Sequence, residues 1–460
     1  MRLLGGLLCA LLALRVGAEP PNVVLMIVDT LRADRVAAAR NGVQVMPHVR
    51  ALAEKGWTFT RAYAQSSWTK PSVTSILTGL YPRTHGVVHG SQLTLKPDAA
   101  PEPVEGVAPE KELAAEYFKR QGYATFGAQT NQLLRSSEGY ARGFDTYLEV
   151  KYTSALQVNK QVYQFAARLK PPFFLYLHYI DPHMPYGPGK AGETIFGSLP
   201  ELNAESLKRV ATPAAVENYY LQFWHKSTGD APKALPPFTA PERDYLRQLY
   251  DVDCRTADAG IGKMVEEITR HWPDTLFVIV ADHGEEFWDH GAMGHGKTLF
   301  EELIHVPLIL FQGTLKPRVI ETPVEALDVL PTIAALCGLP PNSNWQGRSL
   351  AADTLEDRPS FSETLGTIRD TGVALEAVVQ GPQKLVRGAQ GDALYALDGS
   401  TAETQDLSLQ RPEATQALAR LLDAHRAACD AHSLAKVPPA KTALDPAMLD
   451  RLRGLGYLGK

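Results

Sequence analysis

Three runs of consecutive apolar residues predict the centre of the fold. They span residues 23–28, 172–177 and 276–281. Strands that are apolar on both faces are typical of parallel sheets with helices packed on both sides. Amphipathic segments between the runs predict the covering helices, at 47–55, 110–122, 161–169 and 241–271. The pattern therefore predicts an α/β protein built on an extended, mostly parallel sheet.

Each buried run is followed by polar residues that can bind a metal ion. Asp29 follows the first run, the segment 178–186 (HYIDPHMPY) follows the second, and Asp282 and His283 follow the third. Ligands bind at the carboxyl ends of strands in open α/β sheets, so these residues predict an active site. Asp29, Asp282 and His283 offer oxygen and nitrogen ligands, which suit a divalent cation and leave Ca, Mg, Mn, Zn and Fe open.

The stretch 67–79 predicts a nucleophile at the start of a helix. Thr69 precedes Pro71, which the first helical turn tolerates, and apolar residues then follow at helical spacing. A hydroxyl placed there faces free backbone N–H groups and the positive end of the helix dipole, where a phosphate or sulfate group is held. An ordinary N-cap threonine has the same local pattern, so the catalytic interpretation depends on the residues at the strand ends.

Several further polar residues are predicted to act on the substrate. His183 and His295 are the predicted catalytic histidines, which would bind the non-bridging oxygens or protonate the leaving alcohol. The predicted substrate-binding residues are Lys70, Asn131, His178 and Lys297. Surface or packing residues are the alternative for His178 and His183, a solvated loop is the alternative for the segment with His295 and Lys297, and Lys70 could be solvent-exposed. Together with a metal and Thr69, these residues predict transfer of a phosphoryl or sulfuryl group through a covalent intermediate on Thr69.

Composition narrows the class of protein. The chain has 460 residues, of which 45% are hydrophobic, enough for a main core and a second domain. Its net charge of −5 argues against a nucleic-acid partner, which would need a strongly basic surface. The four cysteines include no Cys-x-x-Cys pair, so neither a structural zinc site nor a disulfide framework is predicted.

The apolar pattern also divides the chain. Residues 1–18 read as a signal peptide, with Arg2, an apolar run at 3–14 and a small-residue cleavage site, so we expect a secreted or periplasmic protein. An uncleaved anchor is the alternative, and no other segment is apolar enough to cross a membrane. The first predicted part is a catalytic domain at 19–356, which contains an irregular insertion at 187–235. From about residue 357 the pattern changes to short strands, which predicts a smaller α+β domain at 357–435. A tail at 436–460 follows, with a helix predicted at 446–455.

Six motifs, in one consistent order, resemble sulfatases of the alkaline phosphatase superfamily. They are PNVVLMIVDTLRAD at 21–34, Thr69-x-Pro71-Ser72 with LTGLYP at 77–82, the segment 173–186, DHGE at 282–285, TLFEE at 298–302, and Leu394-Tyr395. The resemblance implies an α/β/α sandwich with a central mixed, mostly parallel sheet and a smaller C-terminal α+β domain. It also implies that Asp29, Asp282 and His283 bind the metal, that Thr69 completes the site, and that His183 and His295 lie near the substrate anion.

The chain departs from the usual sulfatase pattern at four places. Thr69 stands where sulfatases carry a Cys or Ser that becomes formylglycine, so no formylglycine is expected. Val73 replaces the arginine of that signature, Thr30 replaces the second aspartate of the first motif, and residues 130–132 replace a Lys-x-His segment. Threonine nucleophiles occur in this superfamily in nucleotide pyrophosphatase-like phosphodiesterases and lipoteichoic acid synthase-like phosphotransferases.

These observations favour a metal-dependent hydrolase of sulfate or phosphate esters with Thr69 as nucleophile. Its substrate would be a small molecule or an ester of a glycan or lipid. A phosphotransferase acting on envelope components is one alternative. A degenerate homologue that binds metal and anion without turnover is the other. The sequence specifies no oligomeric state.

Overall fold

The computed structural model of the chain describes residues 20–89, 103–166, 169–187, 195–211, 216, 236–365, 374–397 and 403–443. The predicted signal peptide at 1–18 and the predicted tail helix at 446–455 lie outside these residues, as does most of the insertion at 187–235. Within the insertion, residues Ala204–Ala211 form helix α7, where the sequence predicted irregular structure.

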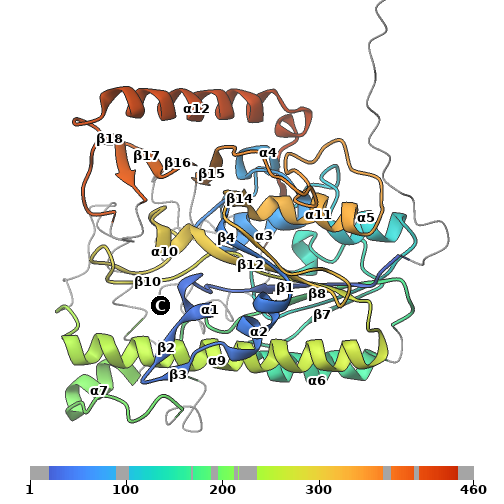
Figure 1. Cartoon of the computed structure of the whole chain (residues 1–460), viewed down its shortest axis with the longest axis horizontal. Coiled ribbons are helices and arrows are strands. Elements are labelled where there is room, and N and C mark those ends of the chain that lie inside the picture. Colours follow the sequence, from blue (N-terminus) through green and yellow to red (C-terminus); the bar gives the residue numbers. More distant parts are fainter. Residues whose placement is uncertain are drawn as a thin grey trace, which may run out of the picture.

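A large mixed sheet forms the middle layer (Figure 1). The described residues give the strand order β13-β4-β12-β9-β1-β8-β6-β7, with β14 also paired to β4. The strands on one side of the sheet run parallel to one another: β1 (Val23–Val28), β6 (Ala124–Gln129), β7 (Thr146–Glu149), β8 (Phe173–Tyr179) and β9 (Leu276–Ala281). Those on the other side make the sheet mixed, because β12 is antiparallel to β9 and β4: β4 (Trp57–Tyr63), β12 (His305–Phe311), β13 (Arg318–Ile320) and β14 (Val324–Glu325).

The register of the three central strands places their ends side by side. Every residue of β1 is buried, as its apolar run predicts. Val28, the last residue of β1, lies opposite Tyr179 of β8 and Ala281 of β9. Because side chains alternate between the faces of a strand, Asp29 and Asp282 follow on the same face, and His178 lies one row behind them. The predicted convergence of the strand ends therefore follows from the pairing.

Helices cover both faces of the sheet (Figure 1). One face carries α2 (Pro47–Lys55), α6 (Ala155–Ala166) and α9 (Ala240–His271), and the other carries α3 (Thr69–Thr78), α5 (Ala114–Arg120) and α11 (Val329–Leu336). The predicted helix at 161–169 is displaced, because Asp181 Oδ2 accepts a 2.6 Å hydrogen bond from the Ala155 backbone N–H and starts α6 earlier. The predicted helix at 110–122 is shorter in the structure.

Short helices, 3₁₀ turns and strand pairs complete the described fold. The helices and 3₁₀ turns are α1 (Asp34–Ala37), α4 (Pro82–His85), α10 (Glu301–Ile304), η1 (Ser136–Glu138), η2 (Ala326–Asp328) and η3 (Ser433–Lys436). Three small strand pairs are β2 (Ala39–Arg40) with β3 (Val43–Gln44), β5 (Val104–Gly106) with β19 (Ala440–Thr442), and β10 (Glu286–Phe287) with β11 (Met293–Gly294).

A smaller antiparallel sheet and a long helix form the C-terminal part. The sheet runs in the order β15 (Ser360–Thr364), β16 (Leu375–Gln380), β17 (Gln383–Gly388) and β18 (Gly391–Ala396), and α12 (Pro412–Ala431) packs on it. Strand β15 was not predicted, since its sequence SFSET has little apolar character. Together with the large sheet, this arrangement confirms the predicted fold class.

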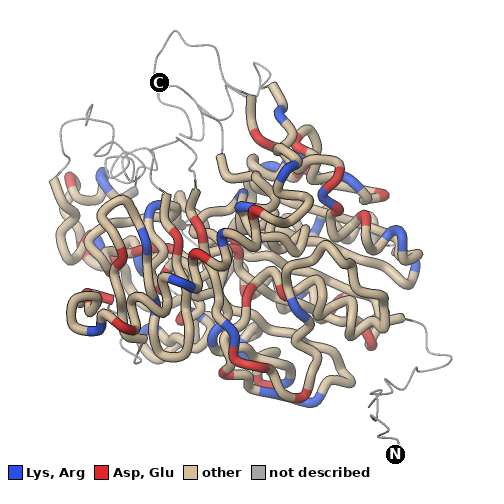
Figure 2. Tube along the Cα trace, turned by 90° about the horizontal axis from the view of Figure 1, so that it is seen from above, with Lys and Arg blue, Asp and Glu red and all other residues tan. Residues whose placement is uncertain are grey.

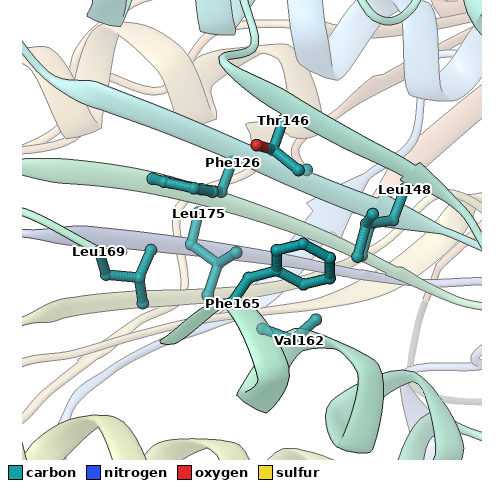
Figure 3. A pocket seen from close by; sticks show the side chains of 9 residues that line it. Phe126, Thr146, Leu148, Val162, Phe165, Leu169 and Leu175 are labelled. Atoms are coloured by element: carbon teal, nitrogen blue, oxygen red, sulfur yellow. The ribbon is translucent and has the colours of Figure 1, made fainter. Parts of the chain in front are cut away.

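Charged residues of both signs are spread over the described part of the chain. In the view of Figure 2, Lys and Arg residues are interspersed with Asp and Glu residues along the chain. In the same residues, no helix combines the length and the apolar character that crossing a bilayer requires. A cavity between α6 and strands β6, β7 and β8 is lined by apolar side chains and Thr146, so it lacks the groups that catalysis needs (Figure 3).

A buried histidine of α12 contacts both strand β15 and Tyr81, which follows α3. His425 of α12 stacks on Phe361, with ring centroids 4.0 Å apart, and meets Tyr81 edge-on. Its Nε2 lies 3.6 Å from Glu363 Oε1 and 3.7 Å from Cys429 Sγ. Burial acts to lower the pKa of His425, but the contacts with Cys429 and Glu363 outweigh it and raise the pKa from 6.5 to about 10.

This raised pKa predicts a pH dependence of stability. Protonated His425 favours the folded state, so its contribution is complete below pH 6.5 and is lost as the pH rises through about 10. We expect the urea midpoint of wild type to exceed that of His425→Gln at pH 6.5, and the difference to shrink by pH 10. A difference that stays constant over this range would contradict the assignment.

Candidate active site

The ends of β1, β8 and β9 bring two carboxylates and an imidazole together. Ligand atoms of Asp29, His178 and Asp282 all lie within 4.8 Å of one another, and all three side chains are fully buried. His178 Nε2 is 3.8 Å from Asp29 Oδ2 and 4.0 Å from Asp282 Oδ2. The sequence predicted His178 to bind substrate, whereas the structure places it against the predicted metal ligands.

Each of the two carboxylates accepts hydrogen bonds through only one of its oxygens. Asp29 Oδ2 accepts a 2.7 Å hydrogen bond from Asn131 Nδ2. Asp282 Oδ1 accepts bonds of 3.2 and 2.9 Å from the backbone N–H groups of Thr30 and His283. Thr30 adopts a positive φ of 56°, and its carbonyl accepts a 2.7 Å bond from Tyr250, so this turn is fixed by packing around the site.

The other oxygen of each carboxylate accepts no hydrogen bond from the described residues. Asp29 Oδ1 and Asp282 Oδ2 are buried without a hydrogen bond, and so are both ring nitrogens of His178. Burial, followed by the charge of Asp282, raises the pKa of Asp29 to about 7. Leaving such a group unpaired costs about 1–3 kcal/mol, and more when it is charged. A divalent cation between the carboxylates would remove this cost, so the donor set fits a metal ion.

His283 offers a neutral nitrogen to the same centre. Its Nδ1–H donates to the Gly284 carbonyl at 2.8 Å, which leaves Nε2 as an acceptor. This Nε2 lies 3.6 Å from both Asp29 Oδ1 and Asp282 Oδ2. Burial lowers the pKa of His283 to about 3, so the ring is neutral, as a metal ligand must be. A side chain on Gly284 would place its Cβ 2.0 Å from the Glu302 carbonyl oxygen, so this turn requires glycine.

Thr69 lies at the first position of α3 and faces this centre. Its Oγ1 is 3.4 Å from His283 Nε2, and the residue is 2% exposed. Trp68 occupies the N-cap position, and no side chain caps the helix, so the N-cap reading of Thr69 does not hold. The Ser72 hydroxyl donates to the Asp282 carbonyl, which ties α3 to the end of β9. The hydroxyl, the histidine and the two carboxylates therefore form one buried cluster.

The two predicted catalytic histidines form a second layer over the cluster. The ring centroid of His295 is 4.6 Å from that of His283 and 5.1 Å from that of His183. His295 Nδ1 donates to Glu285 Oε1 at 2.8 Å, and Glu285 Oε2 accepts a 2.9 Å bond from Tyr186. Burial, followed by the charge of Lys297, lowers the pKa of His295 to about 3. Glu285 therefore orients His295, a role that was not predicted from the sequence.

The two predicted lysines lie in different surroundings. Lys70 is fully buried, and its Nζ donates to Glu138 Oε2 at 2.7 Å, where Arg135 also pairs with Glu138. The sequence did not predict that pairing. Lys297 is half-buried in the loop that carries His295, close enough to Glu285 and Glu286 for their charges to act on it.

Comparisons with known proteins agree with this fold. A family model described as Sulfatase matches residues 21–339. Arylsulfatase K of Danio rerio is 26% identical over 284 residues, which are 56% of this chain and 52% of that protein. The solved phosphonate monoester hydrolase of Silicibacter pomeroyi is 20% identical, with a TM-score of 0.68 over 90% of this chain and 96% of that one.

A further solved structure contains a bound sulfated sugar. It holds a protein with its substrate D-glucosamine-2-N,6-O-disulfate, and it aligns at 15% identity and a TM-score of 0.66, over 91% of this chain and 100% of that one. The chain belongs to the sulfatase family, as the resemblance of its motifs predicted. It spans about half the length of the zebrafish relative, 52% of it.

Proposed function

We propose that this protein is a metal-dependent hydrolase of sulfate or phosphate esters, with Thr69 as its nucleophile. The observation that supports this most is the placement of the Thr69 hydroxyl, 3.4 Å from His283 Nε2, beside two carboxylates with orphaned oxygens. A helix N-terminus, a buried hydroxyl and a cation site in one cluster suit an anionic ester.

Asp29, Asp282 and His283 would hold the metal ion, with His178 beside them. A bound divalent cation lowers the pKa of a neighbouring hydroxyl and neutralises charge that develops on the reacting group. Asn131 keeps Asp29 in position through its 2.7 Å hydrogen bond. The chemistry of these donors leaves Ca, Mg, Mn and Zn as candidates.

The reaction then takes two displacements. The Thr69 oxygen attacks the phosphorus or sulfur of the ester, and the bond to the leaving oxygen breaks. The proton of Thr69 ends on an alkoxide leaving group, or in the solvent when a stable phenolate leaves. Water next attacks the phosphoryl or sulfuryl group on Thr69, which releases inorganic phosphate or sulfate and restores the hydroxyl. No formylglycine enters this scheme, because Thr69 replaces the Cys or Ser from which it is made.

His295 and His183 are proposed to handle the protons. The Nδ1–H of His295 is bonded to Glu285, so its Nε2 is the nitrogen that can accept a proton and deliver it to the leaving alkoxide. His183 lies beside it, and its Nδ1 bonds the Met184 carbonyl. Lys297 would bind the substrate anion from the same loop. A substrate contact by Lys70 stays a prediction, since its ammonium pairs with Glu138.

This assignment predicts a dependence on the leaving group. We expect His295→Gln to slow hydrolysis of alkyl esters by about 10²–10⁴-fold, the usual contribution of a general acid. The p-nitrophenyl ester should slow far less, because p-nitrophenolate leaves without a proton. The measurement is kcat for both esters with wild type and variant. Equal losses on both esters would contradict the assignment of His295 as the proton donor to the leaving group.

The proposed activity is tested with a panel of esters and metals. Wild type, freed of metal, is assayed on p-nitrophenyl sulfate, p-nitrophenyl phosphate, bis-p-nitrophenyl phosphate and an aryl phosphonate with Ca, Mg, Mn or Zn. We expect metal-dependent turnover of at least one ester. The similarity to a phosphonate hydrolase and to a protein with a sulfated sugar substrate supports including both chemistries.

Two other functions are outcomes of the same panel. Metal binding without turnover of any ester would favour the degenerate binding protein, which the loss of the signature arginine at Val73 makes the main rival. Transfer to an added alcohol in preference to water would favour the phosphotransferase. We also infer from residues 1–18 that the protein acts outside the cytoplasm, as a secreted or periplasmic enzyme.

A further inference from the structure

A second group of metal-ligating side chains lies in the segment that follows β9. It consists of Glu286 on β10, His290 in the turn after β10, and Glu302 on α10. One ring nitrogen of His290 and one oxygen of each carboxylate lie within 4.8 Å of one another. Glu286 and Glu302 are buried, at 3% and 6% exposed.

Two atoms of this group are buried without a partner among the described residues. His290 Nδ1 and Glu302 Oε1 are hydrogen-bonded at 2.8 Å, but Glu302 Oε2 and His290 Nε2 have no hydrogen bond. Native structures pair nearly all such atoms, with protein groups, water or an ion. A buried carboxylate with one empty oxygen, beside an imidazole and another carboxylate, points to a cation as the missing partner.

The surrounding contacts hold the three side chains in place. The His290 ring stacks on Phe300, with centroids 3.6 Å apart and planes 10° apart. Glu286 Oε1 accepts hydrogen bonds of 3.1 and 2.8 Å from the backbone N–H groups of His290 and Ala292. Such second contacts orient the ligands of metal sites before the ion binds.

We propose that Glu286, His290 and Glu302 bind a divalent transition metal, Zn²⁺ or Mn²⁺. Two carboxylate oxygens and one imidazole nitrogen suit these ions, whereas Ca²⁺ takes six to eight oxygen ligands. The site is separate from the proposed active centre. Glu285 bonds His295 and Tyr186, while its neighbour Glu286 bonds the turn at His290, so the two adjacent carboxylates serve two different groups.

The position of this site gives it a structural role. Glu286 and Glu302 are the two ends of the segment 286–302, and His290 lies within it, as do His295 and Lys297. The first part of that segment forms a hairpin, in which Glu286 pairs with Gly294 and Phe287 pairs with Met293. An ion bound to Glu286, His290 and Glu302 joins this hairpin to α10, and so fixes the loop that presents His295.

The proposal is tested by measuring bound metal in a variant that lacks Asp282, a proposed ligand of the active-site metal. Full-length Asp282→Asn is freed of metal by chelation, dialysed against Zn²⁺ or Mn²⁺, and analysed for metal per chain. We expect one equivalent in Asp282→Asn and none in Asp282→Asn with His290→Gln. His305→Gln is the matched control in the same background, because His305 contacts Glu301 and the Thr60 carbonyl and lies outside the group. It should keep the equivalent.

Each outcome decides the matter. The proposal is overturned if Asp282→Asn takes up no metal, or if adding His290→Gln leaves its uptake unchanged. Glu302→Gln, which preserves the shape of the side chain, gives a second route should the His290 variant lose its circular dichroism spectrum. Because the readout is bound metal, the result does not depend on hydrolysis by Thr69, and either proposal can fail alone.

Discussion

Thr69→Ala is expected to lower kcat on every ester that the wild type hydrolyses by about 10⁴-fold or more, the scale on which enzymes lose rate when a covalent nucleophile is removed. The physical reason is the position of Oγ1 at the start of α3, 3.4 Å from His283 Nε2, where no other described hydroxyl makes that contact. Metal uptake by Thr69→Ala should persist, since Asp29, Asp282 and His283 remain.

A matched control separates chemistry from helix stability. Thr78 is a buried threonine at the other end of α3, and its hydroxyl donates to the Thr74 carbonyl within the helix. We expect Thr78→Ala to keep kcat within a few-fold of wild type while losing some stability. A covalent phosphoryl or sulfuryl adduct, trapped by rapid acid quench, should appear on Thr69 in the wild type and be missing in Thr69→Ala. Equal rates for wild type and Thr69→Ala would end the nucleophile assignment.

The ends of the central strands could be predicted from the sequence because they depend only on neighbouring residues. A run of six apolar residues followed by Asp29, or by Asp282, identifies both the buried strand and the polar residue after it. The helix at Thr69 is equally local, since Pro71 and the apolar spacing after it mark its first turns. The expectation that these residues lie side by side rested only on the general rule that ligands bind at the carboxyl ends of parallel strands. The sequence did not predict which strands pair.

The remaining features depend on contacts across the sequence. His178 faces the carboxylates because it pairs opposite Ile27, one row behind Asp29, and a register is not visible in one strand alone. Glu138 neutralises Lys70 from 68 residues away, and Asp181 starts α6 from 26 residues away. Glu285 orients His295 only because the chain folds back between them. Such long-range pairing explains why residue types were predicted more closely than their partners.

Asp29→Asn is expected to be more stable than wild type without metal and less stable than wild type with metal. In metal-free protein, burial and the charge of Asp282 raise the pKa of Asp29 to about 7, so ionisation opposes folding. That carboxyl therefore costs stability progressively as the pH rises from about 4 to 7, and the cost is complete above 7. Asparagine at this position cannot ionise, so at pH 8 chelated Asp29→Asn should melt above chelated wild type.

Metal should invert that order. At a free concentration of 100 times its dissociation constant, an ion that binds only the folded state adds about 2.7 kcal/mol of stability. Wild type gains this amount, whereas Asp29→Asn has lost a charged ligand and gains little from the same centre. An ion at Glu286, His290 and Glu302 would stabilise both proteins alike, so the difference between their melting temperatures reports the centre at Asp29 alone.

A carboxylate outside the cluster supplies the control for this comparison. Asp34 pairs with Arg32 and Arg35 near the surface, and these charges lower its pKa to about 2 against the effect of burial. Asp34→Asn should therefore lose stability at pH 8 with and without metal, and its response to metal should equal that of wild type. If Asp29→Asn responds to metal as Asp34→Asn does, the two orphaned carboxylate oxygens do not form a cation site.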